Sequence, residues 1–258
     1  MVNNTSSIPS ALRVRPTAWR GVLVYLAYMA VFYAVFTLVG VDYMHVSDSV
    51  ENVLTMFLPP TIAGFVLTVI LVSVYGWWKP AIRELKRLPK WTLFLPIMAT
   101  VIAAANMVTG DFSTVSPTMF LLVGIGCLMV GFSEETVNRG QLVVAFRTRF
   151  GETGVWLLTS LMFAVFHLPN IFYGVGGATY FQVFVAFGMG SLFYLTRRAT
   201  GSLVFSMLLH AFWDFSSFTS HNVVSALLAP VVGYTAVIVV AILLGRERRA
   251  AKRAAVSA

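Results

Sequence analysis

Long apolar segments separated by short polar connections run through the whole chain. A helix needs roughly 20 mainly apolar residues to cross about 30 Å of hydrocarbon. With 58% hydrophobic and 11% charged residues, the composition argues against a soluble globular domain. We therefore expect an all-α, polytopic membrane helix bundle that forms a single integral membrane domain, 1–258. About eight segments meet or approach the required length: 21–41, 52–78, 91–110, 114–133, 153–168, 178–196, 202–220 and 223–244.

Lys and Arg cluster in every second connection between these segments. They occur before the first segment, in 79–90 ("KPAIRELKRLPK"), after Glu135, at 197–198 and in the C-terminal tail. Cytoplasmic connections retain Lys and Arg, so both termini are predicted to be cytoplasmic. The net charge of +8 is accordingly interpreted as a sign of membrane topology rather than of nucleic-acid binding. His45 and His221 fall in the opposite connections, where we expect them to face solvent.

The chain has one cysteine, Cys127, in the middle of an apolar segment. A single cysteine excludes an intramolecular disulfide and a cysteine-based zinc site. We expect Cys127 to be a small buried hydrophobic residue.

Few ionisable residues lie within or directly beside the apolar segments, and they fall in the C-terminal half. Such residues are costly in a membrane and usually face the bundle interior or a water-filled cavity, so each is a candidate functional residue. The segment 114–133 is expected to end at the cytoplasmic interface, just before two adjacent glutamates. The candidates are Glu134, Glu135 and Arg139 after the fourth segment, His167 at the end of the fifth, and His210 with Asp214 inside the seventh.

The spacing of these residues predicts which of them share a helix face. Glu135 and Arg139 are four residues apart, as are His210 and Asp214, so each pair projects from one side of its helix. Glu134 is turned by about 100° from its neighbour. The two glutamates therefore need not have the same role: one can face a site while the other pairs with the arginine.

Each group also has a purely structural interpretation. In this interpretation, the glutamates and the arginine are an interfacial salt bridge with snorkelling side chains, and His167 is a residue of the packed interior. The His210–Asp214 pair is then a hydrogen-bonded contact that holds helices together. However, these residues come from separate segments, whereas the first three segments contain almost nothing ionisable. One shared site explains this distribution better than unrelated structural pairs.

Two kinds of hydrolytic chemistry fit these side chains. A carboxylate beside a histidine activates water as a general base, and a second histidine with a partner stabilises an oxyanion. Alternatively, Glu134, His167, His210 and Asp214 ligate a divalent metal such as zinc, with an open position for water. A serine mechanism is less attractive because no G-x-S-x-G sequence occurs, and the H-E-x-x-H zinc motif is also absent.

Three motifs, in order, resemble those of a known family. "EETVNRG" (134–140) resembles E-E-x-x-x-R, "FAVFH" (163–167) resembles F-x-x-x-H, and "HAFWD" (210–214) resembles H-x-x-x-[N/D]. These are the motifs of the CAAX-protease and bacteriocin-processing (CPBP, or Abi) intramembrane endopeptidases. The resemblance covers about 105–225, the expected catalytic core. Two positions depart from the pattern: Asn138 replaces an aromatic or aliphatic residue, and Asp214 stands where Asn is common.

The resemblance implies a role for each motif residue. Glu134 would activate water with His167 as its partner, and His210 with Asp214 would form the oxyanion side. Glu135, Arg139 and Phe163 would support the site. An ionised carboxylate cannot donate to an oxyanion as an amide can, so Asp214 would orient His210, bind a cation or be protonated.

The resemblance also implies the activity, namely hydrolysis of peptide bonds in membrane-associated protein or peptide substrates, including lipid-modified ones. We expect a multi-pass protein of a bacterial plasma membrane that contacts lipid and binds no nucleic acid, and the requirement for a metal stays open. Two alternatives remain: a non-catalytic scaffold or immunity-type protein of the same fold that acts by binding partners, and an ion-coupled transporter. The transporter is disfavoured because no repeated pair of Gly/Pro-interrupted helices is visible.

Overall fold

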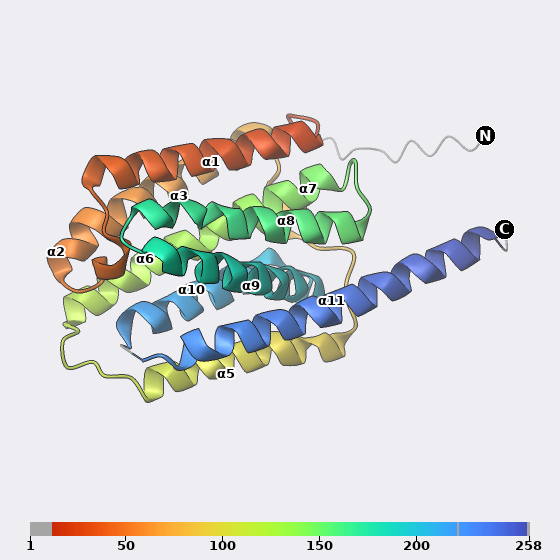
Figure 1. Cartoon of the computed structure of the whole chain (residues 1–258). Helices are drawn as coiled ribbons and strands as arrows, with labels where there is room; N and C mark the ends of the chain where they lie inside the picture. Colours follow the sequence, from red (N-terminus) through yellow and green to blue (C-terminus); the bar gives the residue numbers. More distant parts are fainter. Residues whose placement is uncertain (1–11, 221, 257–258) are drawn as a thin grey trace.

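The computed structural model describes residues 12–220 and 222–256, and His221 lies outside the described residues. Helices and their short connections make up almost all of this part of the chain, and its one β-type contact is an isolated bridge between Arg83 and Ser202. Figure 1 shows the longer helices lying roughly side by side. The prediction of an all-α polytopic bundle is confirmed. The α-helices are α1 (Ala18–Val39), α2 (Val50–Asn52), α3 (Leu58–Tyr75), α4 (Trp78–Ile82), α5 (Phe94–Val108), α6 (Pro117–Glu135), α7 (Leu142–Phe146), α8 (Glu152–Phe166), α9 (Thr179–Thr200), α10 (Leu203–Thr219) and α11 (Val224–Val256).

Short 3-10 and π-helical segments extend or join these helices. The π-helical segments are η2 (Val53–Phe57) and η4 (Thr136–Gln141); the 3-10 segments are η1 (Tyr43–His45), η3 (Lys90–Leu93), η5 (Leu168–Phe172) and η6 (Gly176–Ala178). Because η2 joins α2 to α3, and η4 joins α6 to α7, two long helical stretches are continuous.

Seven helical stretches in the described part of the chain are long and apolar enough to cross a membrane. The predicted segment 202–220 forms α10, whose 17 residues rise about 26 Å. This is slightly less than the hydrocarbon thickness of about 30 Å. Seven of the about eight predicted spans are thus long and apolar enough to cross a membrane, and α10 is not among them. The seven stretches are Ala18–Val39, Val50–Tyr75, Lys90–Val108, Pro117–Phe146, Glu152–Phe172, Gly176–Thr200 and Val224–Val256.

The largest difference from the sequence prediction concerns the stretch Pro117–Phe146. The segment 114–133 was expected to end before the glutamate pair, but the helix continues through η4 to Phe146. Every residue of η4 is buried, so Arg139 lies inside the bundle and not at an interface. A π-helical turn keeps the backbone hydrogen-bonded while it changes which side chains face inward. Hydropathy did not reveal this continuation because the polar residues of η4 lower its mean hydropathy although the segment is buried.

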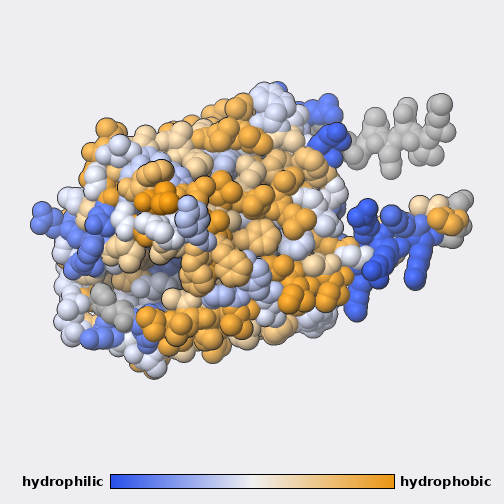
Figure 2. All heavy atoms as spheres, viewed as in Figure 1, coloured by the Kyte–Doolittle hydropathy of each residue, from blue (hydrophilic) through white to orange (hydrophobic). Residues whose placement is uncertain are grey.

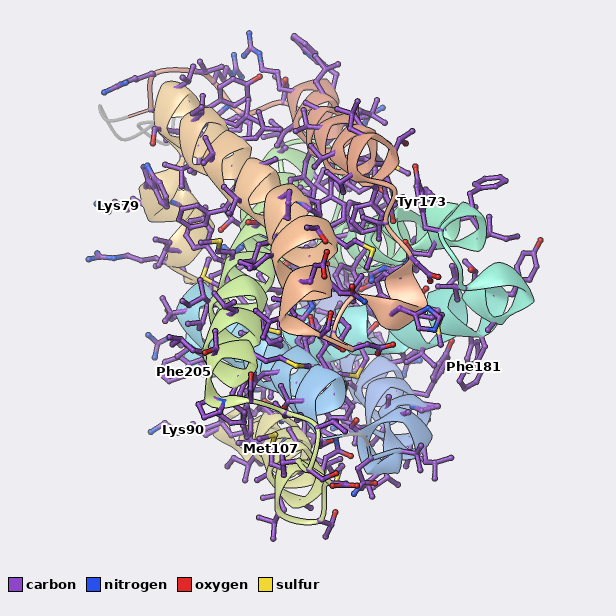
Figure 3. All side chains as sticks on the ribbon, turned by 90° about the vertical axis from the view of Figure 1, so that its left-hand side faces the viewer. Lys79, Lys90, Met107, Tyr173, Phe181 and Phe205 are labelled. Carbon is purple, nitrogen blue, oxygen red and sulfur yellow. The ribbon has the colours of Figure 1, made fainter. Side chains whose placement is uncertain are left out.

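The surface between the two ends of the bundle is apolar. Figure 2 shows a broad hydrophobic band with hydrophilic residues at the ends, and the basic C-terminal part of α11 extends from one of them. Seen end-on in Figure 3, Phe181 and Phe205 lie at the periphery, and both are more than half exposed. In a lipid bilayer such side chains meet hydrocarbon. His45 is exposed, as expected, and forms an ion pair with Asp42.

Close packing of α6 on α10 brings the first and third motifs together. A Cβ atom on Gly131 would lie 2.5 Å from the backbone oxygen of Met207 in α10, so no larger residue fits at this crossing. Small residues at helix contacts allow backbones in membranes to approach closely. The glutamate pair follows Gly131 by one helical turn and therefore lies beside His210.

The first helix is tied to the helix that carries the second motif. The Tyr25 hydroxyl donates to the Met162 carbonyl at 2.8 Å, and the Tyr33 hydroxyl donates to the Phe166 carbonyl at 2.6 Å. Both bonds join α1 to α8. They hold the N-terminal helix against the residues that precede His167.

Candidate active site

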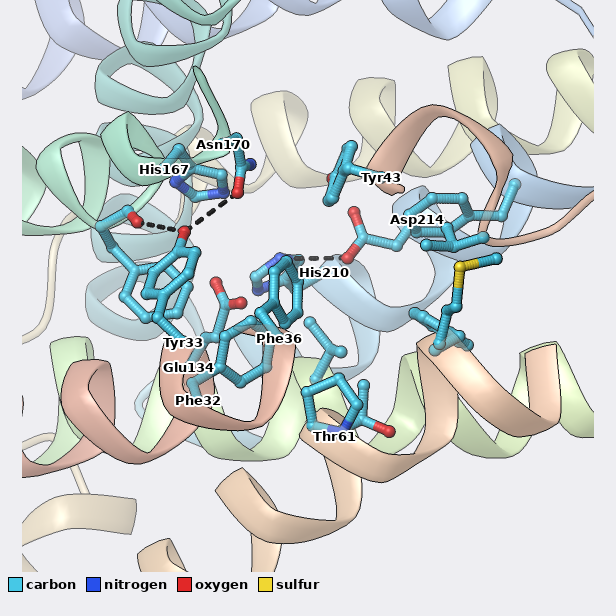
Figure 4. A pocket seen from close by; sticks show the side chains of 17 residues that line it. Phe32, Tyr33, Phe36, Tyr43, Thr61, Glu134, His167, Asn170, His210 and Asp214 are labelled. Atoms are coloured by element: carbon cyan, nitrogen blue, oxygen red, sulfur yellow. Dashed lines mark hydrogen bonds and ion pairs between the residues drawn. The ribbon is translucent and has the colours of Figure 1, made fainter. Parts of the chain in front are cut away.

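A cavity of about 80 Å³ contains the side chains that the sequence singled out. That volume holds a few water molecules. Its lining includes Glu134 from α6, His167 after α8, and His210 and Asp214 from α10. Figure 4 shows these four side chains pointing toward one space. Residues that lie on three separate helices in the sequence prediction thus line the same cavity.

Glu134 is the penultimate residue of α6 and reaches the cavity from the bundle interior. Its side chain is buried, and Oε2 makes no hydrogen bond to any described residue. The backbone carbonyl of Glu134 accepts a hydrogen bond from Asn138 Nδ2 at 2.9 Å. Asn138, which departs from the family pattern, therefore satisfies a carbonyl at the start of the π-helical turn.

Glu135 points away from the cavity and toward Arg139, as the four-residue spacing predicts. Arg139 Nη1 donates to Glu135 Oε1 at 2.8 Å, and both side chains are fully buried. The guanidinium carbon also lies 3.9 Å from the centroid of the Phe163 ring, which is a cation–π contact. A Cβ on Gly190 would lie 2.7 Å from Arg139 Nη2, so α9 can approach the guanidinium only because residue 190 is glycine.

His167 follows the last residue of α8 with one ring nitrogen already engaged. Its Nδ1 lies 2.9 Å from the carbonyl oxygen of Phe163. A carbonyl oxygen only accepts, so Nδ1 carries the proton and Nε2 of the neutral ring is an acceptor. Phe163 thus orients His167 through its backbone while its ring covers Arg139.

His210 is placed between two carboxylates. Its Nδ1 lies 3.3 Å from Glu135 Oε1, and its Nε2 lies 3.4 Å from Asp214 Oδ2. The second contact is the pair expected from the four-residue spacing. Carboxylates beside both nitrogens favour the doubly protonated ring, in which each nitrogen is a donor. Asp214 is the more accessible acid, with 24% of its side chain exposed.

Several polar residues of the cavity were not identified from the sequence. The Tyr33 hydroxyl of α1, which bonds the Phe166 carbonyl, also lies 3.0 Å from Asn170 Oδ1, and Asn170 Nδ2 donates to Gln182 Oε1 at 3.0 Å. Asn170 is buried although it lies in η5, after His167. A tyrosine in an apolar helix and an amide in a connection give no periodic signal, so the sequence did not single out either residue.

Tyr43 lines the cavity from the connection between α1 and α2. Burial raises the pKa of its hydroxyl well above the ordinary value, and the Asp214 carboxylate raises it further. The Tyr43 hydroxyl consequently stays protonated at neutral pH. It can donate a hydrogen bond to a group in the cavity.

The arrangement does not fit a metal ligated by the predicted set. Among the described residues, no group of three or more His, Cys, Asp or Glu side chains is arranged to hold a metal ion. Both nitrogens of His210 already face carboxylates, and Nδ1 of His167 is bonded to a carbonyl. Cys127 is buried, as predicted, and is not among the residues that line the cavity.

Comparison with known proteins supports the resemblance carried by the motifs. No curated protein matches the chain. Residues 115–216, which contain all three motifs, match the model of a family described as type II CAAX prenyl endopeptidase Rce1-like. This is the group of CAAX proteases that the motifs resemble, and the resemblance is confirmed. Residues 115–216 of the chain are thus similar to the Rce1-like type II CAAX prenyl endopeptidases.

Proposed function

We propose that the chain is an intramembrane endopeptidase in which Glu134 activates a water molecule for attack on a peptide bond. The observation that carries the proposal is that Glu134 and His167 meet in one cavity, each with an unengaged acceptor atom. The family match supports a CAAX-type peptidase in general. Residues 105–225 would form its catalytic core, within a single membrane domain.

In the proposed step, Glu134 acts first as a base and then as an acid. The carboxylate takes a proton from water, and the hydroxide oxygen forms a bond to the scissile carbonyl carbon. His167 Nε2 accepts the second hydrogen of the water and so orients it. The protonated Glu134 then gives its proton to the amide nitrogen as the C–N bond breaks, and the carboxylate is restored.

The oxyanion formed in this step would be stabilised by His210. Its ring is the cation of the cavity lining, since the Arg139 guanidinium is already paired with Glu135. Preorganised positive charge in a dry site stabilises developing negative charge strongly. Asp214 would orient the ring through Nε2, and Tyr43 offers a further neutral donor.

The substrate would be a membrane-associated protein or peptide, and lipid-modified substrates fit the apolar surroundings. Phe32, Phe36, Phe57 and Phe218 line the same cavity. The resemblance also implies a bacterial plasma membrane as the location. Because a cavity of about 80 Å³ holds only a few water molecules, the flanking residues of the substrate would lie at its mouth.

The proposal is tested by replacing Glu134 and His167 separately with Ala and measuring cleavage of a membrane-tethered peptide library in detergent. Both variants should remain folded and lose cleavage. A fully active Glu134→Ala variant would overturn the mechanism. If a cellular phenotype survives both substitutions, a scaffold that acts by binding partners is the better description.

A further inference from the structure

The cavity is built at one end of the bundle. Tyr43 and Val46 come from the connection between α1 and α2, and Asn170 comes from η5, directly after α8. Phe218 lies in the last turn of α10. These connections and this helix end lie at the same end of the molecule, opposite the start of α1 and the end of α11 (Figure 1).

The other side of the cavity is closed by protein. His210 lies about 14 Å along the axis of α10 from Thr219, and the fully buried Arg139 follows Glu134 by five residues along its helix. Farther toward the termini, Arg197 and Glu84 are also buried. Their ion pair, 3.1 Å from Nε to Oε2, joins α9 to the connection that follows α4. A substrate approaching from that end would have to pass this buried charged layer.

Charge distinguishes the two ends of the bundle. The connections at the open end, 40–49, 109–116, 167–178 and 220–223, contain no Lys or Arg. They contain Asp42, Asp48 and Asp111. Apart from Arg139, the basic residues belong to the connections and tails at the closed end. Positively charged connections remain in the cytoplasm, so the closed end is cytoplasmic and the open end is not.

We infer that the catalytic cavity is entered from the non-cytoplasmic face, and that the substrate is a peptide segment presented on that side of the membrane or in its outer leaflet. This inference rests on the proposed function and specifies its substrate class. Exported peptides, and membrane proteins with cleavage segments outside the cytoplasm, fit this geometry. Substrates confined to the cytoplasm do not.

Thiol labelling tests the sidedness without any cleavage assay. In a Cys127→Ala background, Met56→Cys places a thiol on the cavity lining, His45→Cys marks the open end, and Arg149→Cys marks the closed end. A membrane-impermeant methanethiosulfonate should modify Met56→Cys and His45→Cys in spheroplasts. It should modify Arg149→Cys only in inside-out vesicles. Modification of Met56→Cys only in inside-out vesicles, or from neither side, would overturn the inference.

A second measurement separates this inference from the proposed activity. Single-span test proteins would carry the same peptide library on either side of the membrane, with and without Glu134→Ala. Cleavage that depends on Glu134 should occur only for segments outside the cytoplasm, and cleavage only of cytoplasmic segments would overturn the inference. If labelling gives the expected sidedness but neither orientation is cleaved, the proposed peptidase activity fails while the orientation of the cavity stands.

Discussion

Two clusters of charged residues are buried in this membrane protein, and they are built differently. The basic-end network joins α8 and α9 to the connections around them, and the cavity cluster joins α6 to α10. The basic-end network consists of Glu84, Arg147, Glu152, Arg197 and Arg198. The cavity cluster consists of Glu134, Glu135, Arg139, His210 and Asp214.

In the basic-end network, each carboxylate has more than one cationic partner. Glu84 Oε2 lies 2.9 Å from Arg147 Nη2 and 3.1 Å from Arg197 Nε. Glu152 pairs with Arg147 at 2.6 Å and with Arg198 at 3.5 Å. Buried ions need such partners to offset their desolvation. This network therefore has the features of a structural element that joins helices at the basic end of the bundle.

The cavity cluster, in contrast, leaves its first acid without a cationic partner at contact distance. Glu135 has both Arg139 and His210, while the Oε2 atom of Glu134 has no hydrogen bond among the described residues. An unpaired buried carboxylate costs stability, and functional sites are where proteins retain such groups. The lack of a cationic partner, rather than burial of charge alone, distinguishes Glu134 as the candidate catalytic acid.

Replacing a glutamate with glutamine should mainly lower the cleavage rate in the cavity cluster and mainly lower the stability in the basic-end network. Glu134→Gln removes the base but keeps the volume, so cleavage should fall by about 10²–10⁴-fold. Thermal stability in detergent should be retained, because no ion pair is broken. The measurement is cleavage rate per folded molecule beside a melting curve, with the exposed Glu51→Gln as control. Full activity in Glu134→Gln would remove the functional difference between the clusters.

Glu84→Gln should instead unfold the protein more easily while sparing the chemistry. It leaves the buried Arg197 without its carboxylate, and breaking a buried ion pair in this way costs about 3–5 kcal/mol. The measurement is the unfolding midpoint in detergent, together with the cleavage rate of the folded fraction. An unchanged midpoint would show that the basic-end network is not structural.

Part of this comparison was accessible from the sequence. Intramembrane position and four-residue spacing predicted the Glu135–Arg139 and His210–Asp214 pairs, and both are present. Arg197 was interpreted only as a marker of cytoplasmic topology, although it is fully buried in an ion-pair network. Topology rules count basic residues near helix ends but do not reveal partners that are distant in the sequence.

The cavity walls contributed by the N-terminal half were also missed. The expected core, 105–225, excludes α1 and the connection after it, yet Tyr33 and Tyr43 line the cavity. An aromatic residue in an apolar helix is ordinary in a membrane protein, so it carries no signal of a site. Long-range contacts between helices decide which aromatic hydroxyl faces polar partners.

Asn138 offers a test of how the cavity cluster is held in place. Asn138→Leu restores an aliphatic residue at this position but leaves the Glu134 carbonyl without its side-chain donor. The loss of one such hydrogen bond costs about 0.5–1.5 kcal/mol. We expect a lower unfolding midpoint and slower cleavage, because the lost bond positions the backbone of the proposed base. Unchanged stability and activity would show that the bond has no structural effect; Ser47→Ala, in the α1–α2 connection, is a control.

Asp214→Asn should have a smaller effect than the substitutions above. The amide oxygen can still accept from His210 Nε2, but the negative charge is lost. Loss of charge from one hydrogen bond is worth ~1 kcal/mol, or about fivefold in rate. Asp214→Ala, which removes the acceptor as well, should be slower than Asp214→Asn. Equal rates for the two variants would show that Asp214 does not act by orienting the ring.

Removal of metal ions should have the smallest effect, because no described group of side chains is arranged to hold one. Treatment with a chelator followed by dialysis should leave both the cleavage rate and the unfolding midpoint unchanged. The readouts are cleavage before and after treatment and metal content of the purified protein. Loss of cleavage that zinc alone restores would contradict the proposed glutamate-activated water. It would also mean that Glu134 acquires a cationic partner after all, which would remove the contrast with the basic-end network.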